Sequence, residues 1–193
     1  MKKLIILSSL ISLLTLTGCF GSGGDSTQTT ELKNFKTYKA TTFAISVPNA
    51  WEIIEAKDFS KDIPIETQVI FRNNIKSDVF TENSNVTKKI LKTGMSSADF
   101  AKSEILENQK SLVNYKEIAR DTEFNVLIGG QMQKSILMMF EGKESAQDPL
   151  IRLIQVYAVN GVDAYTATAA YRSDADGVTV ETMKSAVKSF KVN

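Results

Sequence analysis

Two β-rich runs on either side of Asn160-Gly161 constrain the fold of this chain most strongly. The runs cover residues 150–159 and 164–171, and Asn-Gly between two such runs predicts a tight hairpin. Both alternating sets of the first run contain large apolar residues: Ile151, Leu153, Tyr157 and Val159 on one side, and Ile154 and Val156 on the other. A strand that is apolar on both faces has to be covered on both. The sequence therefore predicts an antiparallel sheet with helices on its two faces.

Five further runs predict strands. They alternate between large apolar and small or polar residues, or they end at turn residues. The predicted strands cover residues 43–47, 67–71, 86–91, 117–127 and 132–140, and the last two flank a turn at Gly129-Gly130. From residue 117 onward the pattern predicts an antiparallel meander.

Two segments have the spacing of amphipathic helices. Ser96 or Ser97 can cap the first, which is predicted from about residue 98 to 113. The second is predicted from residue 178 to 189. Their apolar positions are Ala101, Ile105 and Leu112 in the first helix, and Val180, Met183 and Val187 in the second.

The amino-terminal residues have the pattern of an export signal. Lys2 and Lys3 precede an apolar stretch that runs to Leu16, which is shorter than the roughly 20 residues needed to cross a bilayer. The segment Leu16-Thr17-Gly18-Cys19 resembles the lipobox of bacterial lipoproteins. This resemblance implies cleavage after Gly18, with lipid attached to Cys19. The alternative is a plain secretory peptide with an incidental cysteine.

These features divide the chain into three parts. We expect a lipoprotein signal peptide over residues 1–18, a lipidated cysteine with a flexible Gly/Ser/Thr-rich tether over residues 19–34, and a folded domain over residues 35–193. Acyl chains on Cys19 would hold the protein on the cell membrane or the outer membrane. The domain would then face the periplasm or the cell exterior.

Composition excludes several classes of function. The chain has 23 Lys and Arg against 22 Asp and Glu and no dense basic run, so nucleic acid is not an expected partner. It has no histidine and one cysteine, which excludes Ser-His-Asp and Cys-His catalysis and an imidazole zinc site. A hydrolase would therefore need rarer chemistry.

Several motifs together resemble the Mog1/PsbP-like superfamily. They are Phe43-x-Ile45-x-x-Pro48-x-x-Trp51, the Gly129-Gly130 hairpin, Tyr165-Thr-Ala-Thr168 and the final Ser189-Phe190. The resemblance spans nearly the whole predicted domain, and it implies an α+β fold: an α/β/α sandwich with a central antiparallel sheet of about six strands. Characterised relatives are non-catalytic binding or assembly factors, some acting with a nuclear GTPase and others with the oxygen-evolving centre of photosystem II. No motif in this chain carries over either role.

Three short motifs have ordinary structural explanations. Ser185-x-x-Lys188 and Lys92-Thr93-Gly94 match penicillin-binding enzymes, but they occur in the wrong order, and a solvated helix face explains the first. Asp174-x-Asp176-Gly177 resembles the opening of a calcium loop but lacks the later ligands, so a turn into the last helix explains it. Met138-Met139-Phe140 fits core packing on two faces of a strand.

The sequence therefore predicts a lipid-anchored, non-catalytic module of the cell envelope that binds a protein partner or assists assembly of a complex. No catalytic, metal-binding or cofactor-binding residue is predicted, and Cys19 is the only residue with an assigned role. The alternative is binding of a small hydrophobic or metal ligand in a groove between sheet and helix. An enzyme would require a cluster of Lys, Glu or Asp with perturbed pKa in a cleft.

Overall fold

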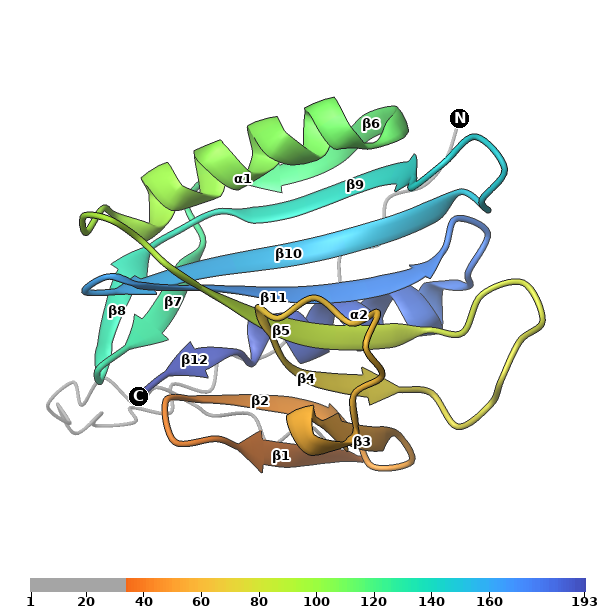
Figure 1. Cartoon of the computed structure of the whole chain (residues 1–193), viewed down its shortest axis with the longest axis horizontal. Helices are drawn as coiled ribbons and strands as arrows, with labels where there is room; N and C mark the ends of the chain where they lie inside the picture. The colour runs from red at the N-terminus through yellow and green to blue at the C-terminus, as the bar shows by residue number, and fades with distance from the viewer. Residues whose placement is uncertain (1–33) are drawn as a thin grey trace, which may run out of the picture. The chain divides into compact units, whose positions relative to one another are not determined.

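The computed structural model of the protein describes residues 34–193 (Figure 1). Cys19, the predicted signal peptide and the predicted tether up to residue 33 lie outside the described residues. Neither helix of residues 34–193 has the length and apolar character needed to span a bilayer.

A seven-stranded antiparallel sheet, here called the main sheet, carries most of the fold. Its strand order is β3-β4-β5-β11-β10-β9-β6. The strands are β3 (Glu52–Glu55), β4 (Thr67–Arg72), β5 (Asn83–Ile90), β6 (Val113–Asp121), β9 (Leu137–Lys143), β10 (Ile151–Asn160) and β11 (Asp163–Arg172). β10 and β11 pair along their full lengths, and Gly161 in the turn between them has a φ of 66°. The hairpin predicted at Asn160-Gly161 is confirmed.

A second sheet of five strands was not predicted. Its order is β1-β2-β12-β7-β8, with strands β1 (Phe35–Lys39), β2 (Phe43–Pro48), β7 (Asn125–Ile128), β8 (Gln131–Lys134) and β12 (Lys191–Val192). The last strand of the chain pairs antiparallel with β2 and parallel with β7. The carboxyl end of the domain is thereby held between two segments that are distant in sequence.

Two helices cover opposite faces of the main sheet (Figure 1). Helix α1 (Ser97–Ser111) packs against β10, whereas α2 (Gly177–Lys188) packs against β11 and β2. A single 3-10 turn, η1 (Ala56–Asp58), follows β3. The predicted layered α+β architecture is confirmed, with the second sheet lying beside α2 as an addition to it.

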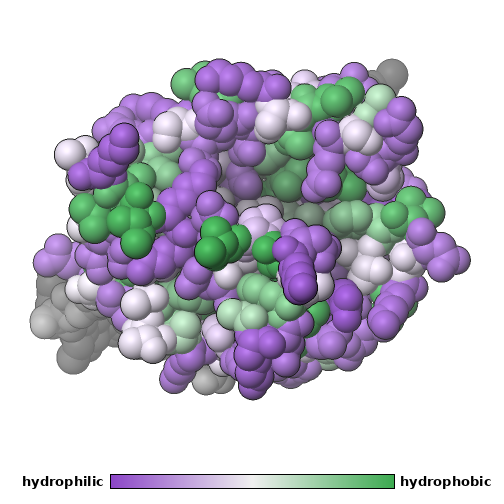
Figure 2. Space-filling view, viewed as in Figure 1, coloured by the Kyte–Doolittle hydropathy of each residue, from purple (hydrophilic) through white to green (hydrophobic). Residues whose placement is uncertain are grey.

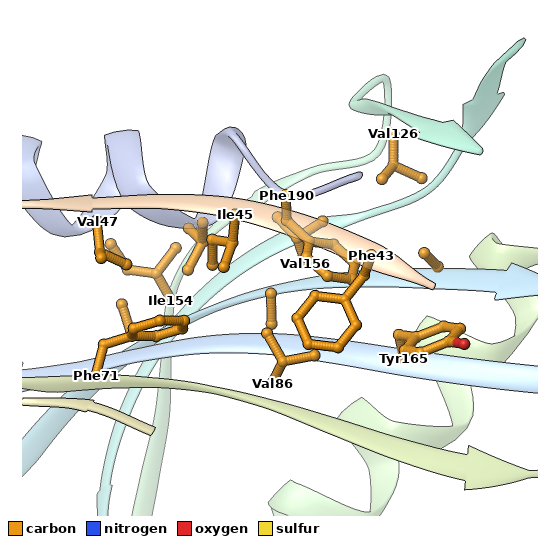
Figure 3. Packing of buried hydrophobic residues seen from close by; sticks show 14 of the residues in the cluster. Phe43, Ile45, Val47, Phe71, Val86, Val126, Ile154, Val156, Tyr165 and Phe190 are labelled. Carbon is orange, nitrogen blue, oxygen red and sulfur yellow. The ribbon is translucent and has the colours of Figure 1, made fainter. Parts of the chain in front are cut away.

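The two faces of the main sheet form two hydrophobic clusters. The α1-side cluster consists of Phe100, Ala101, Ile105, Ile136, Met138, Phe140, Tyr157, Val159 and Ala164. The α2-side cluster is larger, and its members include Phe43, Ile45, Val47, Phe71, Val86, Val126, Ile154, Val156, Tyr165, Met183, Val187 and Phe190. In Figure 3 the β2 side chains of Phe43, Ile45 and Val47 point toward the main sheet. The second sheet therefore shares its core with the main sheet.

The predicted alternation along the strands is confirmed at β9 and β10. Tyr157 and Val159 lie in the α1-side cluster, while Ile154 and Val156 lie in the α2-side cluster. In β9, Met138 is fully buried on the α1 side and Met139 packs against the other cluster. Covering helices and sheet thus bury both faces, as the apolar pattern requires.

The predicted meander from residue 117 is wrong in its first half. The runs 117–127 and 132–140 are each divided between the two sheets, so the Gly129-Gly130 turn joins β7 to β8 in the second sheet. Hydrogen bonds of Ser135 hold the point at which the run 132–140 passes from β8 to β9. The Ser135 hydroxyl donates to the Tyr157 carbonyl at 2.6 Å. The Ser135 N–H donates to the Phe124 carbonyl at 2.9 Å. These bonds satisfy the backbone where the chain leaves one sheet for the other.

We predict that Tyr171→Phe stabilises the protein. The Tyr171 side chain is fully buried, and its hydroxyl has no hydrogen-bond partner among the described residues. Because an unsatisfied buried hydroxyl is costly, its removal is expected to raise the free energy of unfolding by about 1 kcal/mol in urea denaturation. Tyr157→Phe is the matched control, since the Tyr157 hydroxyl donates to Gln155 Oε1 at 2.7 Å and its loss should lower that free energy. Equal destabilisation by both variants would contradict the prediction.

Candidate functional site

Part of the α1-side face of the main sheet is not covered by α1. The helix packs against β10 and β6, at one side of the sheet. At the other side, the connection of residues 56–66 between β3 and β4 crosses the same face (Figure 1). Sheet, helix and connection therefore border an open area, and Figure 2 shows this face hollowed near its centre.

On the same face, a cavity of about 490 Å³, here called the recess, lies between the connection of residues 56–66 and the strands β3, β4 and β5. It is lined by Glu52, Ile54, Asp58, Phe59, Ser60, Ile63, Ile70, Arg72, Asn83 and Asn85. The strands β3, β4 and β5 supply its floor, and the connection of residues 56–66 supplies its wall. A cavity of this size lies within the range of small-molecule sites, about 300–1,000 Å³.

Strand register places the floor residues in two rows. Glu52 pairs with Arg72 and Arg72 with Asn83, which gives a polar row across β3, β4 and β5. In this row Arg72 donates from Nε and Nη2 to the same oxygen of Glu52, at 3.2 and 2.8 Å. The charges of the two residues therefore largely offset each other.

The second row begins apolar and becomes polar. Ile54 pairs with Ile70, and Ile70 pairs with Asn85. Beyond the recess, Asn85 pairs with Thr168 of β11, and Thr168 pairs with Gln155 of β10. This uncharged polar row leads from the recess across the sheet toward α1.

Hydrogen bonds fix the far end of the uncharged row. Gln155 Nε2 donates to Thr168 Oγ1 at 3.1 Å. Gln155 Oε1 accepts from Asn108 Nδ2 of α1 at 2.9 Å and also from the Tyr157 hydroxyl. The side chain of Gln155 is thus held in one orientation by the helix, the neighbouring strand and its own strand.

The pKa shifts imposed by the surroundings in the described residues all point away from neutrality. The backbone N–H of Thr179 lowers the pKa of Asp176, and Arg172 lowers the pKa of Asp174. A hydrogen bond with Glu55 raises the pKa of Lys57, and burial raises the pKa of Tyr157. General acid–base catalysis at neutral pH requires shifts in the opposite direction.

The motif with spaced aspartates forms the predicted turn into the last helix, and Asp176 also caps that helix, which was not predicted. Asp174 forms an ion pair with Arg172 at 2.6 Å, and Asp176 Oδ1 accepts the Thr179 N–H at 2.7 Å as the N-cap of α2. Within residues 34–193 there is no group of three or more metal-ligating side chains. Ser185 and Lys188 lie in α2, and no hydrogen bond in the described structure links them to residues 92–94.

The sequence did not reveal the recess. It is built from residues that are up to 33 positions apart, between Glu52 and Asn85, and β3 was not among the predicted strands. One signal was present in Asn83-Ser84-Asn85-Val86, where Ser84 and Val86 are buried and the two asparagines face the other way. The predicted groove between sheet and helix differs from the recess, because a connection, rather than a helix, forms the wall of the recess.

Comparison with known proteins gives structural likeness without sequence likeness. No protein-family model matches the chain, and no curated protein matches it. Cyanobacterial PsbP (CyanoP) from Synechocystis sp. PCC 6803 is 16% identical with a TM-score of 0.54, over 91% of this chain and 100% of that one. The Ran-binding protein Mog1p of Saccharomyces cerevisiae is 11% identical with a TM-score of 0.54, over 82% of this chain and 95% of that one. The domain therefore has the α+β fold of Mog1 and PsbP-like proteins, which confirms the fold that the motifs implied.

Proposed function

We propose that this protein is a lipid-anchored, non-catalytic module of the cell envelope that binds a protein partner. The lipobox-like segment ending at Cys19 supports the anchor. Mog1p, which has the same fold, is a Ran-binding protein, so this fold is compatible with recognition of a protein.

Two exposed apolar side chains on the connection after β4 are the observation that carries the partner proposal. Ile75 and Val79, on this connection of residues 73–82, are 79% and 59% exposed. Single exposed apolar residues are common, but these two lie on one connection, directly after a strand that also lines a polar recess. Apolar residues beside polar ones are typical of a protein interface. We call Ile75 and Val79 the loop surface.

The anchor is tested by Cys19→Ala in the native host. We expect the wild-type protein to fractionate with membranes and to show a mass increase that matches acylation after loss of residues 1–18. Cys19→Ala should lack that processed species, because no other thiol is present in the chain. Gly18→Ala is the matched control, since it keeps a small residue before the cysteine and should still be processed. Unmodified, soluble wild-type protein would contradict the anchor.

The partner is tested by placing a photo-crosslinking amino acid at Ile75 in the full chain. We expect one discrete crosslinked species in the host envelope, which should be lost when Val79 is changed to aspartate. The same crosslinker at Lys102, on the exposed side of α1, is the control and should give no such species. Equal crosslinking from Ile75 and Lys102, or crosslinking that survives Val79→Asp, would reject the loop surface as the contact.

A further inference from the structure

The recess offers hydrogen-bond donors and acceptors that the fold does not use. The Arg72 bonds to Glu52 involve only Nε, Nη2 and Oε2, so Arg72 Nη1 and Glu52 Oε1 make no bond within residues 34–193. The half-buried Asn85 has no side-chain hydrogen bond within the same residues. An amide carries two donors and one acceptor, and these groups all line one cavity.

The charge of the recess does not favour an ionic ligand. The ion pair of Glu52 and Arg72 leaves Asp58 as the one further charged residue of the lining. The row that continues from the recess, Asn85, Thr168 and Gln155, has no charge. Hydroxyl groups match such a lining, because each hydroxyl both donates and accepts, and a carboxylate such as Asp58 accepts from it.

The recess also has an apolar component. Ile54 and Ile70 lie on its floor, and Phe59 and Ile63 line it from the connection of residues 56–66. All four side chains are only partly buried by the protein itself. Apolar groups with a few convergent polar groups are typical of small-molecule sites. A ligand with apolar C–H faces and hydroxyl edges would satisfy both parts of this lining.

We propose that the recess binds an uncharged saccharide. One sugar ring would lie with its C–H face against Phe59 and Ile63, and its hydroxyls would bond to Asn85, Arg72 and Asp58. This function goes beyond partner binding, and it does not depend on the loop surface or on the lipid at Cys19.

The test is nuclear magnetic resonance titration of the full-length protein in detergent with three neutral tetrasaccharides: cellotetraose, maltotetraose and tetra-N-acetylchitotetraose. We expect at least one of them to shift the side-chain amide signals of Asn83 and Asn85 in a saturable way. Asn85→Ala should weaken that binding at least tenfold, because it removes every bond from this amide, and Phe59→Ala should weaken it similarly. Asn125→Ala, an exposed asparagine of the second sheet, is the matched control and should bind as the wild type does.

Three results would overturn the proposal. No saturable shift with any of the three tetrasaccharides is the first, and unchanged affinity in both Asn85→Ala and Phe59→Ala is the second. The third is a larger response of the same signals to an uncharged tetrapeptide, tetraalanine with an acetylated amino end and an amidated carboxyl end, which would make the recess a peptide site. Asn85→Asp, which keeps the side-chain shape but removes both donors, provides a second variant if Asn85→Ala does not fold.

Discussion

Replacement of Phe43 by alanine is expected to lower the free energy of unfolding by about 3 to 5 kcal/mol, the usual range for a buried phenylalanine. Phe43 is 3% exposed, and its ring centroid lies 6.1 Å from those of Tyr38 and Tyr165 and 6.0 Å from that of Phe190. These partners belong to β1, to β11 of the main sheet and to the segment after α2. The residue thus joins both sheets, and its loss opens a cavity that no single element can fill. Urea denaturation followed by circular dichroism measures the change.

The matched control is Phe80→Ala, in the connection between β4 and β5. Phe80 is partly exposed and belongs to neither cluster, so its removal should cost about 1 kcal/mol or less. Phe43→Ala should unfold in one transition, because the second sheet shares its core with the main sheet. Two separate transitions, or a loss no larger than that of Phe80→Ala, would show that the second sheet is not part of the same cooperative unit.

Local patterns in the sequence predicted the elements whose causes are local. The Asn160-Gly161 turn, the Ser96 cap and the apolar face of α2 each depend on residues within one turn or hairpin, and the structure has all three. The N-cap is Ser96, whose hydroxyl oxygen accepts the Asp99 N–H at 3.1 Å. Contacts between residues that are close in sequence are visible as a periodic spacing of apolar residues or as a preferred residue type at one position.

The second sheet could not be predicted in the same way, because its pairings are between distant segments. β12 has two residues, and its partners β2 and β7 begin 148 and 66 residues earlier, at Phe43 and Asn125 compared with Lys191. A two-residue strand is too short to show alternation. The division of residues 117–127 is hidden for a related reason: both parts are strands, and only tertiary pairing assigns them to different sheets.

The candidate site was less predictable than the fold. The short motifs of the sequence contain Ser185, Asp174 and Asp176, which the structure places in helix α2 and just before it. The recess instead depends on register across β3, β4 and β5, and register is not visible in one sequence. Cys19 is a different case, since processing enzymes would read a short linear segment and no tertiary structure is required for the prediction.

Gly94→Ala is the second substitution with a large expected effect. A Cβ at residue 94 would lie 2.8 Å from the Gly161 carbonyl oxygen, which is backbone and cannot rotate away. Both sides of the contact are fixed, because the Leu91 N–H donates to the Val162 carbonyl at 2.8 Å and the Val159 N–H donates to Ser97 Oγ at 2.9 Å. We expect the free energy of unfolding to fall by about 1 to 3 kcal/mol, the usual cost of overpacking.

Gly177→Ala is the matched control for this substitution. Gly177 is the first residue of α2, and a Cβ there meets no atom within 4 Å. Alanine in place of this glycine should leave the free energy of unfolding unchanged or raise it by less than about 1 kcal/mol, because alanine restricts the unfolded chain and favours the helix. Urea denaturation of both variants under identical conditions gives the two changes in the free energy of unfolding. Their difference isolates the steric overlap at residue 94 from the general effect of replacing a glycine. Equal stability of Gly94→Ala and Gly177→Ala would contradict the prediction. It would mean that the connection between β5 and α1 can move away from the β10–β11 hairpin, and that loss of the two hydrogen bonds joining them does not change the free energy of unfolding.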